Sequence, residues 1–264
     1  MSIIDITSIT VGYGNKTVLE NLSLNIPKKE ILSVVGRNGS GKSTLIKVLS
    51  KTIHPSKGNV FYANRSIYSI KSRSFAKIVA TLPQIHTTPK DITVGSLVEY
   101  GRFPHRKHIL SGLTKEDYEI VNDSMNKTDI YKFRFRKVNT LSGGEMQRVW
   151  IAMVLAQQPS ILLLDEPTSY LDISHQIEIL ELIRKLQIKT GITVVMVLHD
   201  LNLAMRYSDK IAILNDKKIY KPQTATNIIT EDIMSNTFLI KADFYQDKRN
   251  RCPFLIPHKI EVSR

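Results

Sequence analysis

The amino-acid sequence predicts an α/β fold, in which a parallel sheet is covered by helices and an antiparallel β layer lies beside it. Three short apolar runs, "ILSVV" (31–35), "ILLLD" (161–165) and "TVVMVL" (193–198), alternate with helical stretches. Apolar runs of this length are typical of strands buried on both faces, as in a parallel sheet. Nearer the N-terminus, "IDITSITV", "LENLSLNI" and "GNVFYA" alternate apolar with polar residues, which indicates half-exposed antiparallel strands.

Between about Asp91 and Pro159 the patterns become helical. They include "TKEDYEIVNDSM" (114–125) and a helix that begins at Ser142. We therefore expect a helical subdomain, at about residues 86–158, inserted into one domain that spans residues 2–240. The remainder, residues 241–264, is a basic tail whose structure the sequence does not predict.

Composition sets the broad class of protein. A chain of 264 residues with 42% hydrophobic content can bury a full core. No apolar run approaches the ~18 residues of a membrane span, and the N-terminus lacks the basic start and long apolar stretch of a signal peptide. Cys252 is the only cysteine, which excludes an internal disulfide and a cysteine-rich zinc site. These features predict a folded protein of the cytoplasm.

The net charge of +13 predicts attraction to polyanions, which include nucleotides, nucleic acid and acidic lipid head groups. The charge alone does not choose among these ligands. Basic runs such as "KFRFRK" (132–137) are separated along the chain, and we interpret each of them as solvated surface.

"GRNGSGKS" (36–43) follows a predicted strand and opens the predicted helix "TLIKVLS", the context that a phosphate-binding loop requires. The glycines allow backbone amides to wrap phosphates, Lys42 is expected to neutralise the outer phosphates, and Ser43 is expected to ligate Mg²⁺. The predicted phosphate-binding residues are Gly36, Arg37, Asn38, Gly39, Ser40, Gly41, Lys42, Ser43 and Thr44.

Two carboxylates end the second buried run. Asp165 is placed to hold the Mg²⁺ shell, and Glu166 is placed to orient or deprotonate a water that attacks a γ-phosphate. The alternative is a pair of acidic residues in an ordinary turn, which the preceding phosphate loop makes the weaker interpretation.

"LSGGE" (141–145) predicts a second anion-binding helix start. Ser142 and Glu145 fit a capping box, whereas Gly143 and Gly144 each cost the first turn roughly 1 kcal/mol relative to alanine. Exposed backbone amides at a helix tip suit an anion. A protein with one site has no evident use for both this motif and a phosphate loop.

Three further residues are weaker candidates. His199 could donate to a γ-phosphate from a strand edge, but a lone histidine is more often a cap or a packing residue. Gln84 could touch Mg²⁺ or the attacking water, and Tyr13 could stack on a purine, yet each could be an ordinary loop residue.

In this order, and with "LSGGE" between them, these motifs resemble the ATP-binding subunit of ABC transporters, over almost the whole chain up to about Phe238. The resemblance implies a P-loop NTPase (RecA-like) core that binds ATP and Mg²⁺. It also implies a head-to-tail dimer, in which each "LSGGE" binds the γ-phosphate of the ATP held by the other subunit. By the same resemblance, Tyr13 stacks on adenine, Gln84 is the coupling glutamine, Glu166 is the catalytic base, Asp172 contacts the partner across the dimer, and His199 senses the γ-phosphate.

A finer resemblance rests on "YGRFPH" (100–105), "LDISHQIEILELI" (171–183) and "HDLNLAMRYSDKI" (199–211), which are similar to the ATPases of ferric-siderophore importers and their haem and cobalamin relatives. It implies two membrane permeases as partners, an extracytoplasmic binding protein as an indirect partner, and a place on the cytoplasmic face of the membrane. One stretch departs from the family. "LNDKKIYKPQTATN" (214–227) contains no glycine where relatives usually have them, and we expect Asn215 and Asp216 to supply the turn.

Three functions compete. A transport ATPase accounts for all the motifs. A soluble ABC ATPase acting on ribosomes or nucleic acid would suit the charge, but such proteins usually carry two ATPase halves or a long coiled-coil insertion. A stand-alone P-loop kinase would leave "LSGGE" and the region of Asp172 without a purpose.

Overall fold

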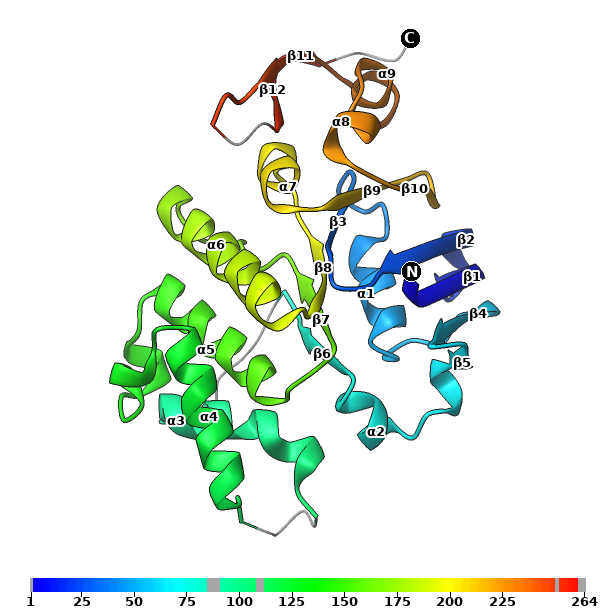
Figure 1. Ribbon diagram of the computed structural model, residues 1–264. Coiled ribbons are helices and arrows are strands. Elements are labelled where there is room, and N and C mark those ends of the chain that lie inside the picture. The colour runs from blue at the N-terminus through cyan, green and yellow to red at the C-terminus, as the bar shows by residue number, and fades with distance from the viewer. Residues whose placement is uncertain (1, 85–90, 108–111, 250–251, 261–264) are drawn as a thin grey trace. The chain divides into compact units, whose positions relative to one another are not determined.

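A computed structural model describes residues 2–84, 91–107, 112–249 and 252–260 of the protein (Figure 1). The chain divides into two compact units. The first combines Met1–Ser69 with Thr193–Arg264, and the second is Ile70–Ile192.

The first unit contains an antiparallel sheet and a mainly parallel one. The antiparallel sheet has the strand order β2-β1-β4-β5. The mainly parallel sheet has the strand order β10-β9-β3-β8, in which β3 is parallel to both β8 and β9. Every residue of β3 and β8 is buried, as expected for strands covered on both faces. The strands are β1 (Ser2–Tyr13), β2 (Lys16–Pro27), β3 (Ile31–Val35), β4 (Lys57–Tyr62), β5 (Arg65–Ser66), β8 (Thr193–Val197), β9 (Lys210–Asn215) and β10 (Lys218–Gln223).

The helices of the first unit are short, and its C-terminal part forms a β-hairpin that the sequence did not predict. The hairpin joins β11 (Ile240–Gln246) to β12 (Pro253–Ile260) and lies beside α7 in Figure 1. The Asn202 carboxamide on α7 donates to the Leu255 carbonyl at 3.1 Å and accepts from the Leu255 amide at 2.8 Å. The other elements are α1 (Lys42–Leu49), η1 (Ile67–Ser69), α7 (Leu201–Tyr207), α8 (Ala225–Ile228), α9 (Glu231–Ile233) and the π-helical turn η5 (Met234–Phe238).

The second unit is mostly helical and is wider than the predicted helical insertion at about residues 86–158. Its two strands, β6 (Val79–Leu82) and β7 (Ile161–Asp165), pair in parallel, and α3, α4 and α5 pack on one another. The predicted subdomain start overlaps residues 85–90, which lie outside the described residues. The helices are α2 (Ser72–Ala76), α3 (Val94–Glu99), η2 (Tyr100–His105), α4 (Lys115–Lys127), η3 (Tyr131–Phe133), η4 (Val138–Thr140), α5 (Gly143–Ala156) and α6 (Ile173–Thr190).

A buried ion pair joins three segments of the second unit. The Arg102 guanidinium donates to the Asp117 carboxylate at 2.7 Å and to the Ala156 carbonyl at 2.8 Å, and both side chains of the pair are at most 10% exposed. Asp117 also closes the capping box of α4 with Thr114. Burial alone would raise the pKa of Asp117, but the Thr114 amide and the Arg102 guanidinium outweigh it and lower that pKa to about 2.

The predicted glycine-free turn is confirmed in part. Asp216 and Lys217 both have positive φ and form a two-residue turn between β9 and β10, whereas Asn215 is the last residue of β9. Consecutive positive φ values at the two central positions are those of a type I′ hairpin turn. Lysine rather than asparagine thus takes the second strained position.

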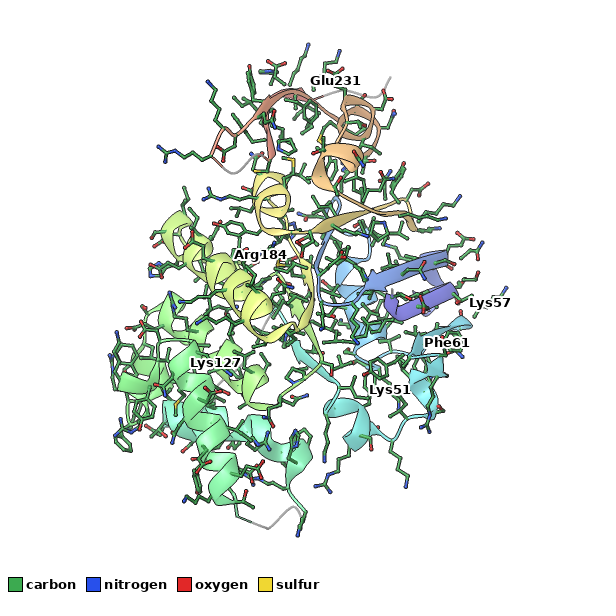
Figure 2. The ribbon with its side chains drawn as sticks, in the orientation of Figure 1. Lys51, Lys57, Phe61, Lys127, Arg184 and Glu231 are labelled. Carbon is green, nitrogen blue, oxygen red and sulfur yellow. The ribbon has the colours of Figure 1, made fainter. Side chains whose placement is uncertain are left out.

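Much of the positive charge is carried by side chains at the surface, such as Lys57 and Lys127 in Figure 2, both of which are exposed. No helix in the part of the chain that the structure describes is both long and apolar enough to cross a membrane.

Candidate active site

The phosphate loop of the first unit runs from the end of β3 to α1. Gly36, Gly39 and Gly41 all have positive φ, and a Cβ added to Gly36 would lie 2.2 Å from the Leu214 carbonyl oxygen. α1 starts without a side-chain cap and without an acidic residue in its first turn. A phosphate at this helix start would accept hydrogen bonds from backbone amides and would be stabilised by the helix dipole.

Lys42 lies across this loop. Lys42 is buried, with 5% of the residue exposed. Its ammonium group donates to the Gly36 carbonyl at 2.9 Å and to the Arg37 carbonyl at 3.0 Å. The two loop carbonyls thus hold the ammonium group of Lys42 against the phosphate loop. The phosphate-binding role of Lys42 stays a prediction.

Tyr13 and His199 belong to the same unit. The Tyr13 hydroxyl lies 3.5 Å from the Thr44 hydroxyl on α1, and 48% of Tyr13 is exposed, so its ring is available for stacking. His199 is exposed and lies two residues beyond the end of β8. Because β8 is parallel to β3, His199 and the phosphate loop leave the sheet at the same edge, and the Leu198 amide donates to the Val34 carbonyl at 3.3 Å.

The second unit brings Gln84 and Glu166 together. β6 and β7 are in register at Leu82 and Leu164, so both residues follow paired strand ends. The Gln84 amide donates to Glu166 Oε2 at 2.5 Å. Glu166 has φ 53, a left-handed conformation that is uncommon for glutamate and typical of functional sites. The neighbouring Asp165 is 7% exposed at the end of β7.

Ser169 is a site residue that the sequence analysis missed. Its hydroxyl donates to Glu166 Oε2 at 2.8 Å, and its amide donates to the Glu166 carbonyl at 3.1 Å. A serine three residues after a carboxylate in a turn can reach back in this way, and the sequence "EPTS" contains that spacing. The carboxylate of Glu166 is therefore oriented by two side-chain donors.

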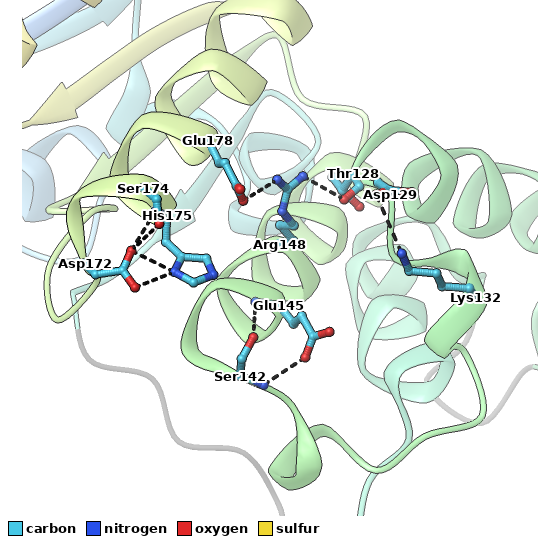
Figure 3. Close-up of polar contacts among 10 residues, drawn as sticks. All are labelled: Thr128, Asp129, Lys132, Ser142, Glu145, Arg148, Asp172, Ser174, His175 and Glu178. Atoms are coloured by element: carbon cyan, nitrogen blue, oxygen red, sulfur yellow. Dashed lines mark hydrogen bonds and ion pairs between the residues drawn. The ribbon is translucent and has the colours of Figure 1, made fainter.

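The helix start at "LSGGE" forms the predicted capping box, shown in Figure 3. The Glu145 amide donates to the Ser142 hydroxyl at 3.3 Å, and the Ser142 amide donates to the Glu145 carboxylate at 2.9 Å. The hydrogen bond from the Ser142 amide is the main cause of a lowered pKa at Glu145, and the cations of Arg136 and Lys132 lower this pKa further.

The two glycines of this turn differ. A Cβ on Gly144 would lie 2.2 Å from His175 Cδ2 on α6, whereas a Cβ on Gly143 would make only an ordinary contact with Leu171 at 3.4 Å. Close packing of α5 against α6 therefore accounts for Gly144. The expectation that both glycines serve to expose amides remains a prediction for Gly143.

Asp172 is the N-cap of α6. It accepts from the His175 amide at 2.9 Å, from the Ser174 hydroxyl at 2.8 Å and from the His175 ring (Figure 3). The His175 amide and then the two side chains lower the pKa of Asp172 to about 2, so this exposed carboxylate is ionised at neutral pH.

A cavity of about 240 Å³ opens between the start of α5 and the loop after Glu166. It is lined by Gln84, Gly143, Met146, Gln147, Glu166, Ser169, Tyr170 and Leu171. Gln147 also donates to the Pro167 carbonyl at 2.8 Å, which ties α5 to this loop. Among the residues that the structure describes, no three His, Cys, Asp or Glu gather as a metal cage. Mg²⁺ is usually held by one or two side chains together with substrate phosphates, and the assignment of Ser43, Asp165 and Gln84 to this role stays a prediction.

Comparison with known proteins agrees with these motifs. The ABC transporter family matches residues 19–169. The chain is 43% identical over 258 residues to the "Probable siderophore transport system ATP-binding protein YusV" of Bacillus subtilis (strain 168), covering 98% of this chain and 94% of the relative. It is 41% identical to the ferric enterobactin transport ATP-binding protein FepC of Escherichia coli (strain K12), covering 94% and 92%. It is 38% identical to the iron(3+)-hydroxamate import ATP-binding protein FhuC of Bacillus subtilis (strain 168), covering 98% and 96%.

Solved structures show the same fold. A bacterial ABC transporter cassette, described as dimeric, aligns with a TM-score of 0.73 and 30% identity, covering 84% of this chain and 98% of that one. A chain of an ABC transporter in an inward-facing conformation aligns with a TM-score of 0.85 over 98% of both chains, at 24% identity.

Proposed function

The chain belongs to the ABC transporter family and is an ATPase of that family, and on this premise we propose that it powers the import of an iron–siderophore or a related metal chelate. The observation that supports this substrate class is the near full-length similarity to three ATP-binding proteins named for siderophore, enterobactin and hydroxamate transport. We propose that the metal chelate does not bind to this chain. Two membrane permeases carry the cargo, an extracytoplasmic protein delivers it, and the chain works at the cytoplasmic face of the membrane.

The phosphate loop binds the nucleotide. Its amides and the uncapped first turn of α1 hold the phosphates, Lys42 exchanges its loop carbonyls for phosphate oxygens, and Tyr13 stacks on the adenine. Mg²⁺, held by Ser43, Asp165 and Gln84, would draw negative charge from the phosphates when bound.

Glu166 removes a proton from the attacking water. Gln84 and Ser169 orient its carboxylate through the two hydrogen bonds to Oε2. His199, at the edge where the phosphate loop begins, donates to the γ-phosphate. General-base catalysis of this kind contributes about 10²–10⁴-fold to a rate.

The two phosphate-binding motifs act on different nucleotides. Each chain binds one ATP with its own loop, and "LSGGE" binds the γ-phosphate of the ATP on a second copy, so that two chains enclose two ATP molecules head to tail. The capping box fixes the conformation of the first turn of α5, whose amides would bind that ligand. Asp172, ionised and exposed, contacts the second copy.

Two experiments test this proposal. The chain, tagged and purified from its own cells in the presence of ATP, is expected to bring down a pair of integral membrane proteins; recovery of ribosomes or nucleic acid instead would favour the soluble ABC ATPase. Cells that lack the chain are expected to lose uptake of a ⁵⁵Fe-loaded siderophore and to regain it with the wild type but not with Glu166→Gln. Unchanged iron uptake in the deletion strain would overturn the substrate class while leaving the ATPase activity standing.

A further inference from the structure

Seven consecutive residues of the second unit have no place in the ATPase mechanism. They form "YKFRFRK", Tyr131–Lys137, here called the basic–aromatic strip. The strip contains four cations, three aromatic rings and no acidic residue. It begins in η3 and ends just before the turn that leads to α5.

The cations of the strip lie over its own rings. The Arg134 guanidinium carbon is 4.5 Å from the centroid of Tyr131 and 4.2 Å from that of Phe135. The Lys132 ammonium nitrogen and the Arg136 guanidinium carbon each lie 5.1 Å from the centroid of the Phe133 ring. Positive charge and apolar ring surface are therefore presented together rather than on opposite faces.

The backbone of the strip is held in place by α3. The Val94 amide donates to the Arg136 carbonyl at 3.0 Å, and the Gly95 amide donates to the Arg134 carbonyl at 2.9 Å. A Cβ on Gly95 would lie 3.2 Å from that same carbonyl oxygen, so the approach is close. A preformed backbone reduces the entropy that the strip would lose on binding a ligand.

The strip is partly exposed: Lys132 and the three residues from Phe135 to Lys137 are exposed, whereas Tyr131, Phe133 and Arg134 are half-buried. Phe135 is 78% exposed even with the Arg134 guanidinium over one face of its ring, so most of its apolar surface faces solvent and is available for burial in a ligand. Lys137 pairs with Asp91 at 2.5 Å and Lys132 lies 4.0 Å from Asp129. Among the described residues Arg134 makes no ion pair, so its charge is available to an external anion.

We propose that the basic–aromatic strip binds the surface of a membrane that contains anionic phospholipids. Arg134 and its neighbours meet the phosphate groups, and Phe135 enters the boundary between head groups and acyl chains. The inference rests on the proposed function only in that a transport ATPase works beside a membrane. Single-stranded nucleic acid is a poorer fit, because bases stack on open ring faces and here cations lie over faces of all three rings.

Binding of the purified full-length chain to liposomes tests this proposal. Co-sedimentation with vesicles of 30% phosphatidylglycerol in phosphatidylcholine is compared with pure phosphatidylcholine, in buffer of roughly 0.1 M salt. The wild type is expected to partition onto the anionic vesicles only. Arg134→Gln is expected to lower the partition coefficient about fivefold, since one cation near an anionic surface is worth about 1 kcal/mol. Phe135→Ser is expected to lower it on the order of tenfold, through the loss of ring burial.

Matched controls lie on α6 of the same unit. Lys189→Gln removes one exposed cation, and Ile188→Ser removes an apolar side chain that is 68% exposed. Both are expected to bind the vesicles as the wild type does. Equal losses of binding in the control variants and the strip variants would overturn the proposal and indicate that the net charge of the chain drives binding. Equal binding to neutral and anionic vesicles, or no binding to either, would also overturn it.

Two further measurements distinguish a lipid ligand from a nucleic-acid ligand, and the role of the strip from the ATPase function. Tighter binding of a fluorescent single-stranded RNA than of vesicles, lost in Phe135→Ser, would reassign the strip to nucleic acid and overturn the lipid proposal. ATP hydrolysis without lipid is expected to be unchanged in Arg134→Gln and Phe135→Ser. Absence of ATP hydrolysis in a wild type that still binds anionic vesicles would count against the proposed function and not against the strip.

Discussion

Replacing Gly144 by alanine should strain the contact between α5 and α6. The new Cβ would lie 2.2 Å from His175 Cδ2, about 1.2 Å short of an ordinary van der Waals contact at 3.4 Å. The His175 ring cannot retreat freely, because its Nδ1 lies 2.8 and 2.9 Å from the two Asp172 oxygens. Overpacking of this kind costs about 1–3 kcal/mol, against a gain of roughly 1 kcal/mol in helix propensity. We expect Gly144→Ala to lower the free energy of unfolding by about 1 kcal/mol.

Gly143→Ala is the matched control, since it shares the propensity gain but meets only Leu171 at 3.4 Å. Urea denaturation of the purified chains should place the midpoint of Gly144→Ala below, and that of Gly143→Ala at or above, the wild-type value. In a double-mutant cycle, adding His175→Ala should recover most of the loss. A Gly144→Ala chain as stable as Gly143→Ala would refute the packing argument and return both glycines to the role of exposing amides.

Substitutions at three other residues test the chemistry and the core. Glu166→Gln should bind ATP and accumulate as an ATP-bound dimer, while turnover falls by about 10²-fold or more; hydrolysis near the wild-type rate would remove Glu166 from its role. Ser169→Ala should lower kcat for ATP about five- to tenfold with KM little changed, and Ser169→Thr should restore kcat because the hydroxyl is kept; equal loss in both variants would indicate a packing role. Asp117→Asn should lower the free energy of unfolding by about 3–5 kcal/mol, because it leaves Arg102 without its carboxylate partner. Since the pKa of Asp117 is lowered to about 2 in the folded chain, the stability that this pair gives the wild type should be complete above about pH 4 and be lost toward pH 2, and the mutant should lack this dependence. Parallel curves of stability against pH for the two proteins would contradict this.

The fold was predictable where one local pattern determines it. The runs of β3, β7 and β8 are wholly buried, as their apolar composition predicts, and the spacing of Ser142 and Glu145 produced the predicted capping box. The C-terminal hairpin was not predictable, because β11 mixes charged and apolar residues. Its position also depends on Asn202, which is far away in the sequence.

The candidate site was predictable as a set of motifs but not as a set of contacts. The hydrogen bond from Ser169 to Glu166 depends on a turn in which Glu166 is left-handed, and no propensity indicates that conformation for glutamate. The close approach of His175 to Gly144 likewise joins two helices, so a capping pattern within one helix could not reveal it.

In the proposed dimer, the phosphate loop of one chain and the "LSGGE" helix of the other act on the same ATP. Lys42→Ala and Ser142→Arg damage different halves of each composite site, so each mutant homodimer has both sites broken. A heterodimer of the two mutants, isolated through two different tags, pairs the intact loop of one chain with the intact helix of the other and restores one whole site. This heterodimer is expected to retain ATP well above either mutant homodimer. Retention no better than in the homodimers, with heterodimer formation verified, would contradict the head-to-tail arrangement and leave Ser142 as a helix cap only.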